Sequence, residues 1–359
     1  MIGNSVVLTS ALAFAAALAI SFALTPVVKA FAYKIGAVDV PKDSRRMHKT
    51  PIPRVGGLAI FLGFVVSTLI FGRIDGEMRA ILLGAVIIVL LGIVDDVVAL
   101  KPGAKFAGQI LAAIIPIMAN VRISLFTNPF KADDFIHLGW LSVPVTILWI
   151  VGMTNAVNFI DGLDGLACGV SSIASLTVFT IALLVSEPYV AIVMAALAGA
   201  CFGFLPYNLN PAQIFMGDTG AMFLGYMLAT ISITGLFKLA AIISFIVPFI
   251  ILGLPIFDTS FAIVRRLLKG QSPLQADRGH IHHRLVDMGF DQKQSVAILY
   301  AVSVMLGLSA VIFTTSGEMK IAIFTVAVLL CFFFAMNIKI KKHNGEHNVE
   351  AHTEEEDKK

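Results

Sequence analysis

The chain has 359 residues, of which 58% are hydrophobic and 14% charged, and its mean hydropathy is +0.89. This composition excludes a soluble globular domain, because no water-exposed fold could bury so much apolar surface. It predicts an all-α protein that crosses a lipid bilayer several times. The net charge of +3 is small, and we expect no nucleic-acid partner.

Apolar segments long enough, or nearly so, to cross a bilayer recur along the chain. A bilayer core needs roughly 20 helical residues, and about eleven segments meet this requirement: 5–28, 56–72, 79–94, 104–121, 139–158, 164–185, 188–207, 218–237, 239–262, 294–315 and 319–338. No linker divides them. We therefore predict one polytopic catalytic domain over residues 1–340, followed by a disordered, charged cytoplasmic tail over residues 341–359.

The connections between these segments differ in basic residues. If the loops alternate between the two sides, one side receives most lysines and arginines, in residues 29–54, 101–105 and 265–293 and in the tail. The positive-inside rule makes that side cytoplasmic, with the N-terminus outside and the C-terminus inside. The first basic residue is Lys29, so the first segment is expected to be a retained span and not a cleaved signal.

The ninth segment contains helix-breaking residues. Pro248, Gly253 and Pro255 predict a kink or a break there. Residues 262–270, AIVRRLLKG, are then predicted to form a basic amphipathic segment at the inner membrane surface. A break of this kind would open a lateral groove for a lipid chain.

Residues 155–166, NAVNFIDGLDGL, place four polar side chains in an otherwise apolar region. Asn155, Asn158, Asp161 and Asp164 recur every third residue, so on a helix or helix end they would face one cavity. Such groups near a bilayer are costly unless they meet a cation, a substrate or water, which indicates a functional site. The alternative is a helix cap followed by a glycine turn.

The remaining unusual polar residues fall on the same predicted side as this motif. Asp95, Asp96, Asp218 and Asp258 supply hard oxygen ligands of the kind that magnesium prefers, often together with substrate phosphates. Three basic residues, Lys105, Arg278 and Arg284, are candidates to neutralise phosphate oxygens. Lys49 and Arg54, in the basic loop before Gly56, are further candidates to approach the substrate phosphates, and the positive-inside rule explains them equally well.

The cluster HIHHR at 280–284 has an alternative interpretation as a zinc site. It has no cysteine nearby, and adjacent histidines are poorly spaced to share one metal, so phosphate or sugar contacts are favoured. Cys168, Cys201 and Cys331 lie in apolar runs and are interpreted as packing residues.

Five ordered motifs together carry a family resemblance. They are the DD pair at 95–96, NAVNFIDGLDGL at 155–166, YNLNPAQIFMGDTG at 207–220, PIFDT at 255–259 and DRGHIHHRL at 277–285. They resemble the signature regions of the polyprenyl-phosphate N-acetylhexosamine-1-phosphate transferases of glycosyltransferase family 4. The resemblance extends from Pro26 to about Gly289. The HIHHR form is similar to bacterial enzymes that load GlcNAc-1-phosphate onto undecaprenyl phosphate for teichoic acid or polysaccharide synthesis.

The resemblance implies a reaction: UDP-GlcNAc and undecaprenyl phosphate give undecaprenyl-diphospho-GlcNAc and UMP. It also implies a magnesium cofactor, or manganese in its place. The enzyme is expected in the bacterial plasma membrane, with its active site facing the cytoplasm. The resemblance leaves open whether it forms a homodimer. The implied catalytic residues are Asp95, Asp96, Asp161 and Asp218, and the implied metal ligands are Asp218 and Asn158. The implied substrate contacts are Lys105, Asn155, Asp164, Asn208, Phe215, His280, His282, His283 and Arg284. Among these, Phe215 is expected to stack on uracil, and Arg284 is expected to be a buried guanidinium that contacts the diphosphate or the sugar.

Three alternatives stay open at this point. The phospho-MurNAc-pentapeptide transferases usually have three successive histidines where this chain has Arg284 after two. A cation-coupled transporter would also carry carboxylates and broken helices in the membrane, but here the carboxylates cluster at one interface and no inverted repeat is visible. A structural scaffold would leave the costly polar face unexplained.

Overall fold

The structure, a computed structural model, describes residues 4–40, 51–127, 135–235, 243–268, 270 and 280–315. It is almost entirely helical, which confirms the fold class expected from composition. Its helices are α1 (Asn4–Lys34), α2 (Gly57–Phe71), α3 (Gly76–Val98), α4 (Pro102–Met118), α5 (Ser142–Ile160), α6 (Leu166–Leu184), α7 (Pro188–Asn208), α8 (Gly217–Gly235), α9 (Ile243–Ile251), α10 (Gly253–Leu268), α11 (Ile281–Asp287) and α12 (Gln292–Thr314).

Two short antiparallel hairpins, which the sequence did not predict, join helices. Strand β1 (Val38–Asp39) pairs with β2 (Ile52–Pro53), and β3 (Leu125–Thr127) pairs with β4 (Phe135–His137). A 3₁₀ turn at Gly139–Leu141 leads from β4 into α5. The short helix α11, which holds the histidine motif, was not predicted either.

Six helices in the described part of the chain are long and apolar enough to cross a membrane: α1, α3, α5 with its preceding 3₁₀ turn, α6, α7 and α12. Two more apolar helices, α2 and α4, are shorter. The chain is therefore a multi-pass membrane protein. Each of the first ten predicted segments overlaps a helix in the described residues, and the ninth overlaps both α9 and α10. Residues 319–338 and the predicted tail at 341–359 lie outside the described residues. The total of eleven spans stays a prediction.

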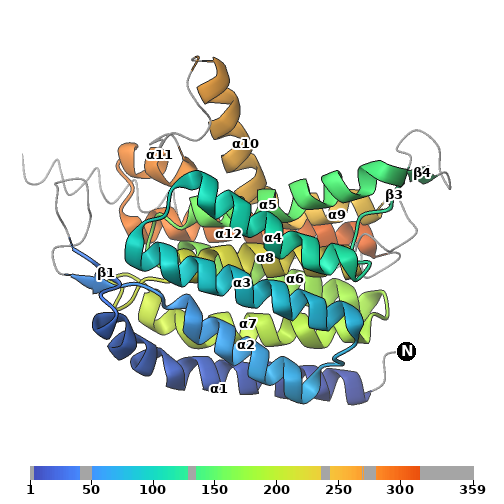
Figure 1. The fold of residues 1–359 in the computed structure, drawn as a ribbon, viewed down its shortest axis with the longest axis horizontal. Coiled ribbons are helices and arrows are strands. Elements are labelled where there is room, and N and C mark those ends of the chain that lie inside the picture. The colour runs from blue at the N-terminus through green and yellow to red at the C-terminus, as the bar shows by residue number, and fades with distance from the viewer. Residues whose placement is uncertain are drawn as a thin grey trace, which may run out of the picture.

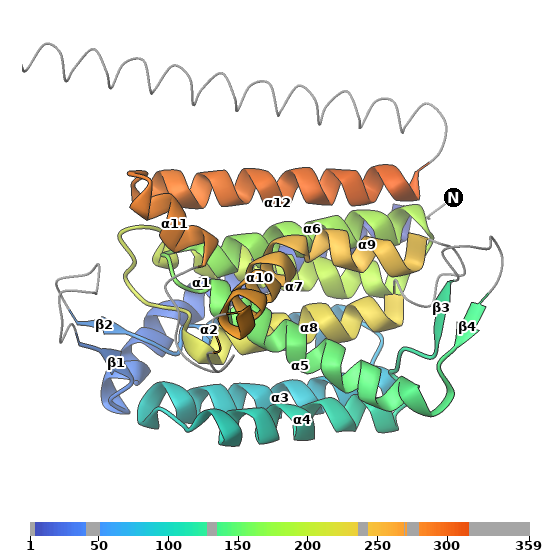
Figure 2. The same ribbon diagram turned by 90° about the horizontal axis from the view of Figure 1, so that it is seen from above.

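The long helices run side by side in one bundle (Figure 1). Helix α12 lies along one side of the bundle next to α6, and α3 and α4 lie on the opposite side (Figure 2). The β1–β2 hairpin and α11 mark one end of the bundle, and the β3–β4 hairpin marks the other (Figures 1 and 2). The candidate site lies at the end that carries β1 and β2.

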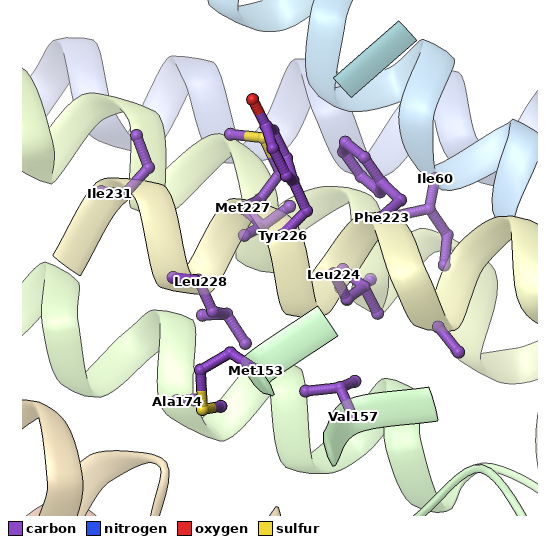
Figure 3. Packing of buried hydrophobic residues seen from close by; sticks show 14 of the residues in the cluster. Ile60, Met153, Val157, Ala174, Phe223, Leu224, Tyr226, Met227, Leu228 and Ile231 are labelled. Carbon is purple, nitrogen blue, oxygen red and sulfur yellow. The ribbon is translucent and has the colours of Figure 1, made fainter. Parts of the chain in front are cut away.

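Helix α8 is the centre of the bundle. Every residue from Gly217 to Gly235 is buried except Asp218, and its side chains project in all directions toward neighbouring helices (Figure 3). The ring of Phe223 meets that of Phe61 edge to face, with 5.4 Å between centroids. The hydroxyl of Tyr226 donates a hydrogen bond to the Ile81 carbonyl at 3.1 Å. A helix that is apolar all round is expected at such a fully enclosed position.

The predicted break in the ninth segment is confirmed. Helix α9 ends at Ile251, and α10 begins at Gly253 and leaves the bundle at a steep angle (Figure 1). Most exposed side chains of helix α10 are apolar, whereas Asp258 and Arg266 are buried. The exposed apolar residues are Phe257, Phe261, Val264, Leu267 and Leu268. This pattern is the one expected of a helix whose outer face meets lipid.

Candidate active site

Four side chains from four helices meet at the first turn of α8. The Asp218 carboxylate accepts a hydrogen bond from Asn158 Nδ2 at 2.9 Å and pairs with the Lys105 ammonium. Lys105 Nζ also lies 2.9 Å from Asp95 Oδ2. We call Asp95, Lys105, Asn158 and Asp218 the ionic cluster. Because α3, α4, α5 and α8 each supply one member, the geometry of the cluster depends on the packing of the whole bundle.

The two adjacent aspartates at the end of α3 have different roles. Asp95 faces Lys105, and its other oxygen accepts a hydrogen bond from the Leu100 amide at 2.7 Å. Asp96 is 7% exposed and accepts hydrogen bonds from the backbone amides of Asp218 and Thr219, both at 3.0 Å. A carboxylate at the N-terminus of a helix satisfies free amides and complements the helix dipole. Asp96 therefore fixes the turn that carries Asp218.

The approach of α3 to α8 depends on a glycine. A Cβ atom on Gly92 would collide with the backbone of Thr219, so only glycine lets α3 come close enough for Asp96 to cap α8. Adjacent residues on a helix point in different directions. When Asp96 caps α8, Asp95 therefore faces Lys105 in the ionic cluster.

Arg54, for which the sequence left two interpretations open, is a second cation at the site. Its Nε lies 3.4 Å from Asp96 Oδ1, and the side chain is partly exposed. The segment after β2 is held against the α8 loop, because the Phe215 amide donates to the Pro53 carbonyl and the Gly56 amide donates to the Phe215 carbonyl. The signal in the sequence was the basic loop before Gly56. Lys49, in the same loop, lies outside the described residues.

Asp161 follows the last turn of α5 and lies within electrostatic reach of Asp218. Burial, followed by the negative charge of Asp218, raises the pKa of Asp161 to about 8. The same negative charge of Asp218 that raises this pKa is the charge that would hold a cation. The next residue, Gly162, lies so close to the His282 ring that a Cβ atom there would collide with Nε2. The DG turn thus connects the ionic cluster to the histidine motif.

Asp164 and Asn208 bind protein groups in the structure. Asp164 Oδ2 accepts a hydrogen bond from Asn210 Nδ2 at 2.9 Å. Asn208 accepts from the Gly165 amide at 3.2 Å and donates to the Ile214 carbonyl at 3.1 Å. These bonds tie the loop after α5 to the loop before α8. The nucleotide contacts expected of Asp164, Asn208 and Phe215 stay predictions.

The histidine motif is attached to α10 through Asp258. One carboxylate oxygen of Asp258 lies 2.8 Å from His280 Nδ1, and the other accepts the Ile281 amide at 2.8 Å. The rings of His280 and His282 are parallel, with 5.7 Å between centroids. Burial, followed by the neighbouring His283, lowers the pKa of His282 to about 4. His282 is therefore neutral at physiological pH, and packing against Gly162 is its observed role.

Arg284 differs from the expectation of a buried guanidinium. The side chain is exposed, and its guanidinium lies over the Phe261 ring of α10, 5.5 Å from the centroid. The expected burial was wrong because α11 is a short helix at the edge of the bundle that turns this residue outward. Its contact with substrate, like that of the half-buried His283, stays a prediction. Arg278 lies outside the described residues.

The donor set of the ionic cluster fits magnesium. In the described part of the chain, no three histidine, cysteine or acidic residues converge as a complete metal cage. Magnesium does not need one, because it is commonly held by one or two carboxylates together with substrate phosphates and water. The carboxylates of Asp218 and Asp95 converge on one cationic group, Lys105, and Asn158 adds a neutral amide. The site therefore stabilises positive charge at the point where a divalent ion would be shared with a phosphate.

Together, the bundle and this cluster define a polytopic membrane protein with a charged polar site at one end of its helices. Comparisons with known proteins agree with that class. The sequence profile of glycosyl transferase family 4 matches residues 78–236. The chain is 42% identical over 321 residues, 89% of each chain, to a probable undecaprenyl-phosphate N-acetylglucosaminyl 1-phosphate transferase of Bacillus subtilis (strain 168).

Two further relatives set the range of the similarity. A decaprenyl-phosphate N-acetylglucosaminephosphotransferase of Mycobacterium tuberculosis (strain CDC 1551 / Oshkosh) is 36% identical over 310 residues, 78% of this chain and 76% of its own. A phospho-N-acetylmuramoyl-pentapeptide-transferase of Staphylococcus epidermidis (strain ATCC 12228 / FDA PCI 1200) is 34% identical over 280 residues, 73% of this chain and 85% of its own. The chain belongs to glycosyl transferase family 4, which confirms the resemblance seen in its motifs.

Proposed function

We propose that this protein transfers GlcNAc-1-phosphate from UDP-GlcNAc to undecaprenyl phosphate, as the first membrane step of teichoic acid or surface polysaccharide synthesis. The observation that carries the proposal is the 42% identity over 89% of both chains to the Bacillus subtilis relative, whose name states the acceptor and the transferred group. The pentapeptide-transferring relatives are less similar to this chain.

The net reaction joins two anions. An oxygen of the lipid phosphate forms a bond to the sugar-linked phosphorus of UDP-GlcNAc, and the bond from that phosphorus to the bridging oxygen breaks, which releases UMP with that oxygen. Lys105 and Arg54 offset the repulsion between the two substrates, since both cations lie beside the cluster. Asp95 positions Lys105 and the lipid phosphate. The reaction has little need of a general base, because the lipid phosphate, a phosphate monoester, is already largely deprotonated at cytoplasmic pH.

Asp218 and Asn158 would hold the magnesium ion, and manganese can replace it. When bound, the ion supplies charge stabilisation to the diphosphate and to the departing UMP. Asp161, beside Asp218, would contact a phosphate or sugar oxygen. His280, fixed by Asp258, and the exposed Arg284 contact the diphosphate and the sugar.

The topology that we propose has eleven spans in one catalytic domain, with the N-terminus outside and the active site at the cytoplasmic surface. The unequal distribution of basic residues supports this orientation. It predicts that a cysteine at Met288, beside α11, is shielded from an impermeant thiol reagent in intact cells, whereas one at Ser124, between α4 and β3, reacts. Both side chains are exposed. The reverse labelling pattern would overturn the orientation.

A donor comparison tests the function directly. Purified protein in detergent, supplied with undecaprenyl phosphate and magnesium, should convert radiolabelled UDP-GlcNAc into a lipid-linked product and release UMP. UDP-MurNAc-pentapeptide should give no product under the same conditions. Transfer from the pentapeptide donor, with none from UDP-GlcNAc, would place the chain in the peptidoglycan branch. A protein that uses neither donor, with its melting transition intact, would contradict the transferase proposal.

A further inference from the structure

A pair of amide side chains lies inside the bundle below the ionic cluster. Gln109 of α4 is 1% exposed, although no sequence motif includes it. Asn155 Nδ2 donates to Gln109 Oε1 at 2.6 Å, and Gln109 Nε2 donates back to Asn155 Oδ1 at 3.3 Å. Asn155 Nδ2 also reaches the Val151 carbonyl at 2.8 Å, and Gln109 Nε2 lies 3.2 Å from Met222 Sδ. Each amide therefore has its main partner across the α4–α5 interface.

The pair repeats the arrangement of the cluster one helical turn deeper. On α4, Gln109 follows Lys105 by four residues, and on α5, Asn155 precedes Asn158 by three. On α8, Met222 follows Asp218 by four. Residues three or four apart lie above one another on the same face of a helix. The same three helices thus meet twice, first through charged and amide groups and then through the amide pair and a thioether.

The contacts of Gln109, Asn155 and Met222 can fix the register of helices that lie in a membrane. Lipid tails solvate apolar side chains about as well as a neighbouring helix does, so apolar contact alone fixes helix register weakly. Helix α4 exposes Phe106, Leu111 and Met118, so part of its surface lies outside the bundle. A reciprocal amide pair is specific, because sliding or rotating one helix would leave a buried amide without its partner.

We infer that Gln109 and Asn155 are positioning residues that fix α4 against α5, so that Lys105 and Asn158 both reach Asp218. This inference rests on the proposed function for its activity readout. It replaces the substrate contact predicted for Asn155 with a structural partner one turn below the reacting groups. It also adds Gln109 to the residues on which the reaction depends.

The test exchanges the two amides. Gln109→Asn and Asn155→Gln each change one side-chain length, and the double exchange restores the summed length across the interface. We expect each single variant to lower kcat about 10-fold, as for other supporting residues of a metal site, and the double exchange to recover to within about 3-fold of wild type. Thr230→Val is the matched control, because Thr230 is buried in α8 and bonds only carbonyls of its own helix in the described structure.

A second readout does not need turnover. The rise in melting temperature on adding magnesium alone should shrink in both single variants and return in the double exchange, while the control keeps it. Folded single variants with wild-type kcat and an unchanged magnesium response would overturn the inference, as would a double exchange no better than the singles. A wild type that responds to magnesium but transfers no GlcNAc-1-phosphate would contradict the proposed function alone. A wild type with neither property would overturn both.

Discussion

Helices α8 and α10 both begin at glycine and both carry one acidic residue of the candidate site, but they lie in opposite surroundings. Helix α8 is enclosed on all sides, so the position of Asp218 is fixed by several neighbours, including the cap that Asp96 provides. Helix α10 leaves the bundle and exposes an apolar face, and its Asp258 points inward to His280. The difference separates an enclosed part of the site, which holds charge, from a part attached through a helix whose outer face is exposed and largely apolar.

This comparison predicts different consequences for the two carboxylates. Asp218 belongs to the ionic cluster, so its loss should remove chemistry while the bundle, fixed by apolar packing around α8, stays folded. Asp258 contacts the histidine motif and not the cluster, so its loss should displace one group of substrate contacts. The variants below are ordered from the largest expected effect to the smallest.

The largest effect is expected for Asp218→Asn. The amide keeps the size of the side chain but removes the charge that pairs with Lys105 and would hold magnesium, so we expect kcat to fall by roughly 1000-fold. The measurement is transfer of labelled GlcNAc-1-phosphate at saturating magnesium. The control is Asp287→Asn, which changes an exposed carboxylate on α11. Near-normal turnover by a folded Asp218→Asn protein would remove this residue from the catalytic cluster.

A smaller effect is expected for Asp258→Asn. The side chain can still accept the Ile281 amide, but its NH₂ group now faces His280 Nδ1 and forces the other ring tautomer. We expect a loss in kcat of about 10-fold with the melting temperature nearly unchanged. The decisive measurement is a double-mutant cycle: in a His280→Ala background, Asp258→Asn should cost little more. If the two losses multiply instead, Asp258 does not act through His280, and the attachment between α10 and α11 has another purpose.

Much of this architecture could be predicted from the sequence, because lipid imposes simple rules. Long apolar runs marked the helices, and Pro248, Gly253 and Pro255 marked the break between α9 and α10. The loop assignment placed Asp95, Lys105 and Asp218 at one membrane interface, but nothing in the sequence predicted that both carboxylates pair with Lys105. No local pattern could show that Asp95 faces a cation while Asp96 caps α8, since that division depends on the close approach of α3 at Gly92.

The residues that the sequence analysis missed, left open or misplaced share one property: their positions depend on tertiary packing. Gln109 lies alone in an apolar helix, and its partner Asn155 is 46 positions away, so neither periodicity nor motif spacing connects them. Arg54 was named, but the positive-inside rule explained it as well as a phosphate contact did. The expected burial of Arg284 was wrong because a short helix at the bundle edge, such as α11, has no periodicity long enough to predict it. In each case the missing information was tertiary packing.

The smallest effect concerns stability and the neutral state of His282. The ring is 2% exposed, and its folded pKa of about 4 lies below the ordinary value of 6.5. The unfolded chain therefore binds a proton more readily than the folded protein between these two values. The stabilisation linked to His282 is fully present above pH 6.5 and is lost as the pH falls toward 4. Lowering the pH from 7 to 5 should cost about 2 kcal/mol through this group.

The measurement compares the melting temperature of wild type and His282→Gln in detergent from pH 7 to pH 5. Glutamine has a similar size and does not titrate, so the variant should be less sensitive to acid, although its melting temperature at pH 7 is lower because the ring contact with Gly162 is lost. Other acid-sensitive groups act in both proteins and cancel in the difference. If the two curves run parallel, His282 gains no proton on unfolding in this range, and its ring does not lie neutral and buried against the DG turn.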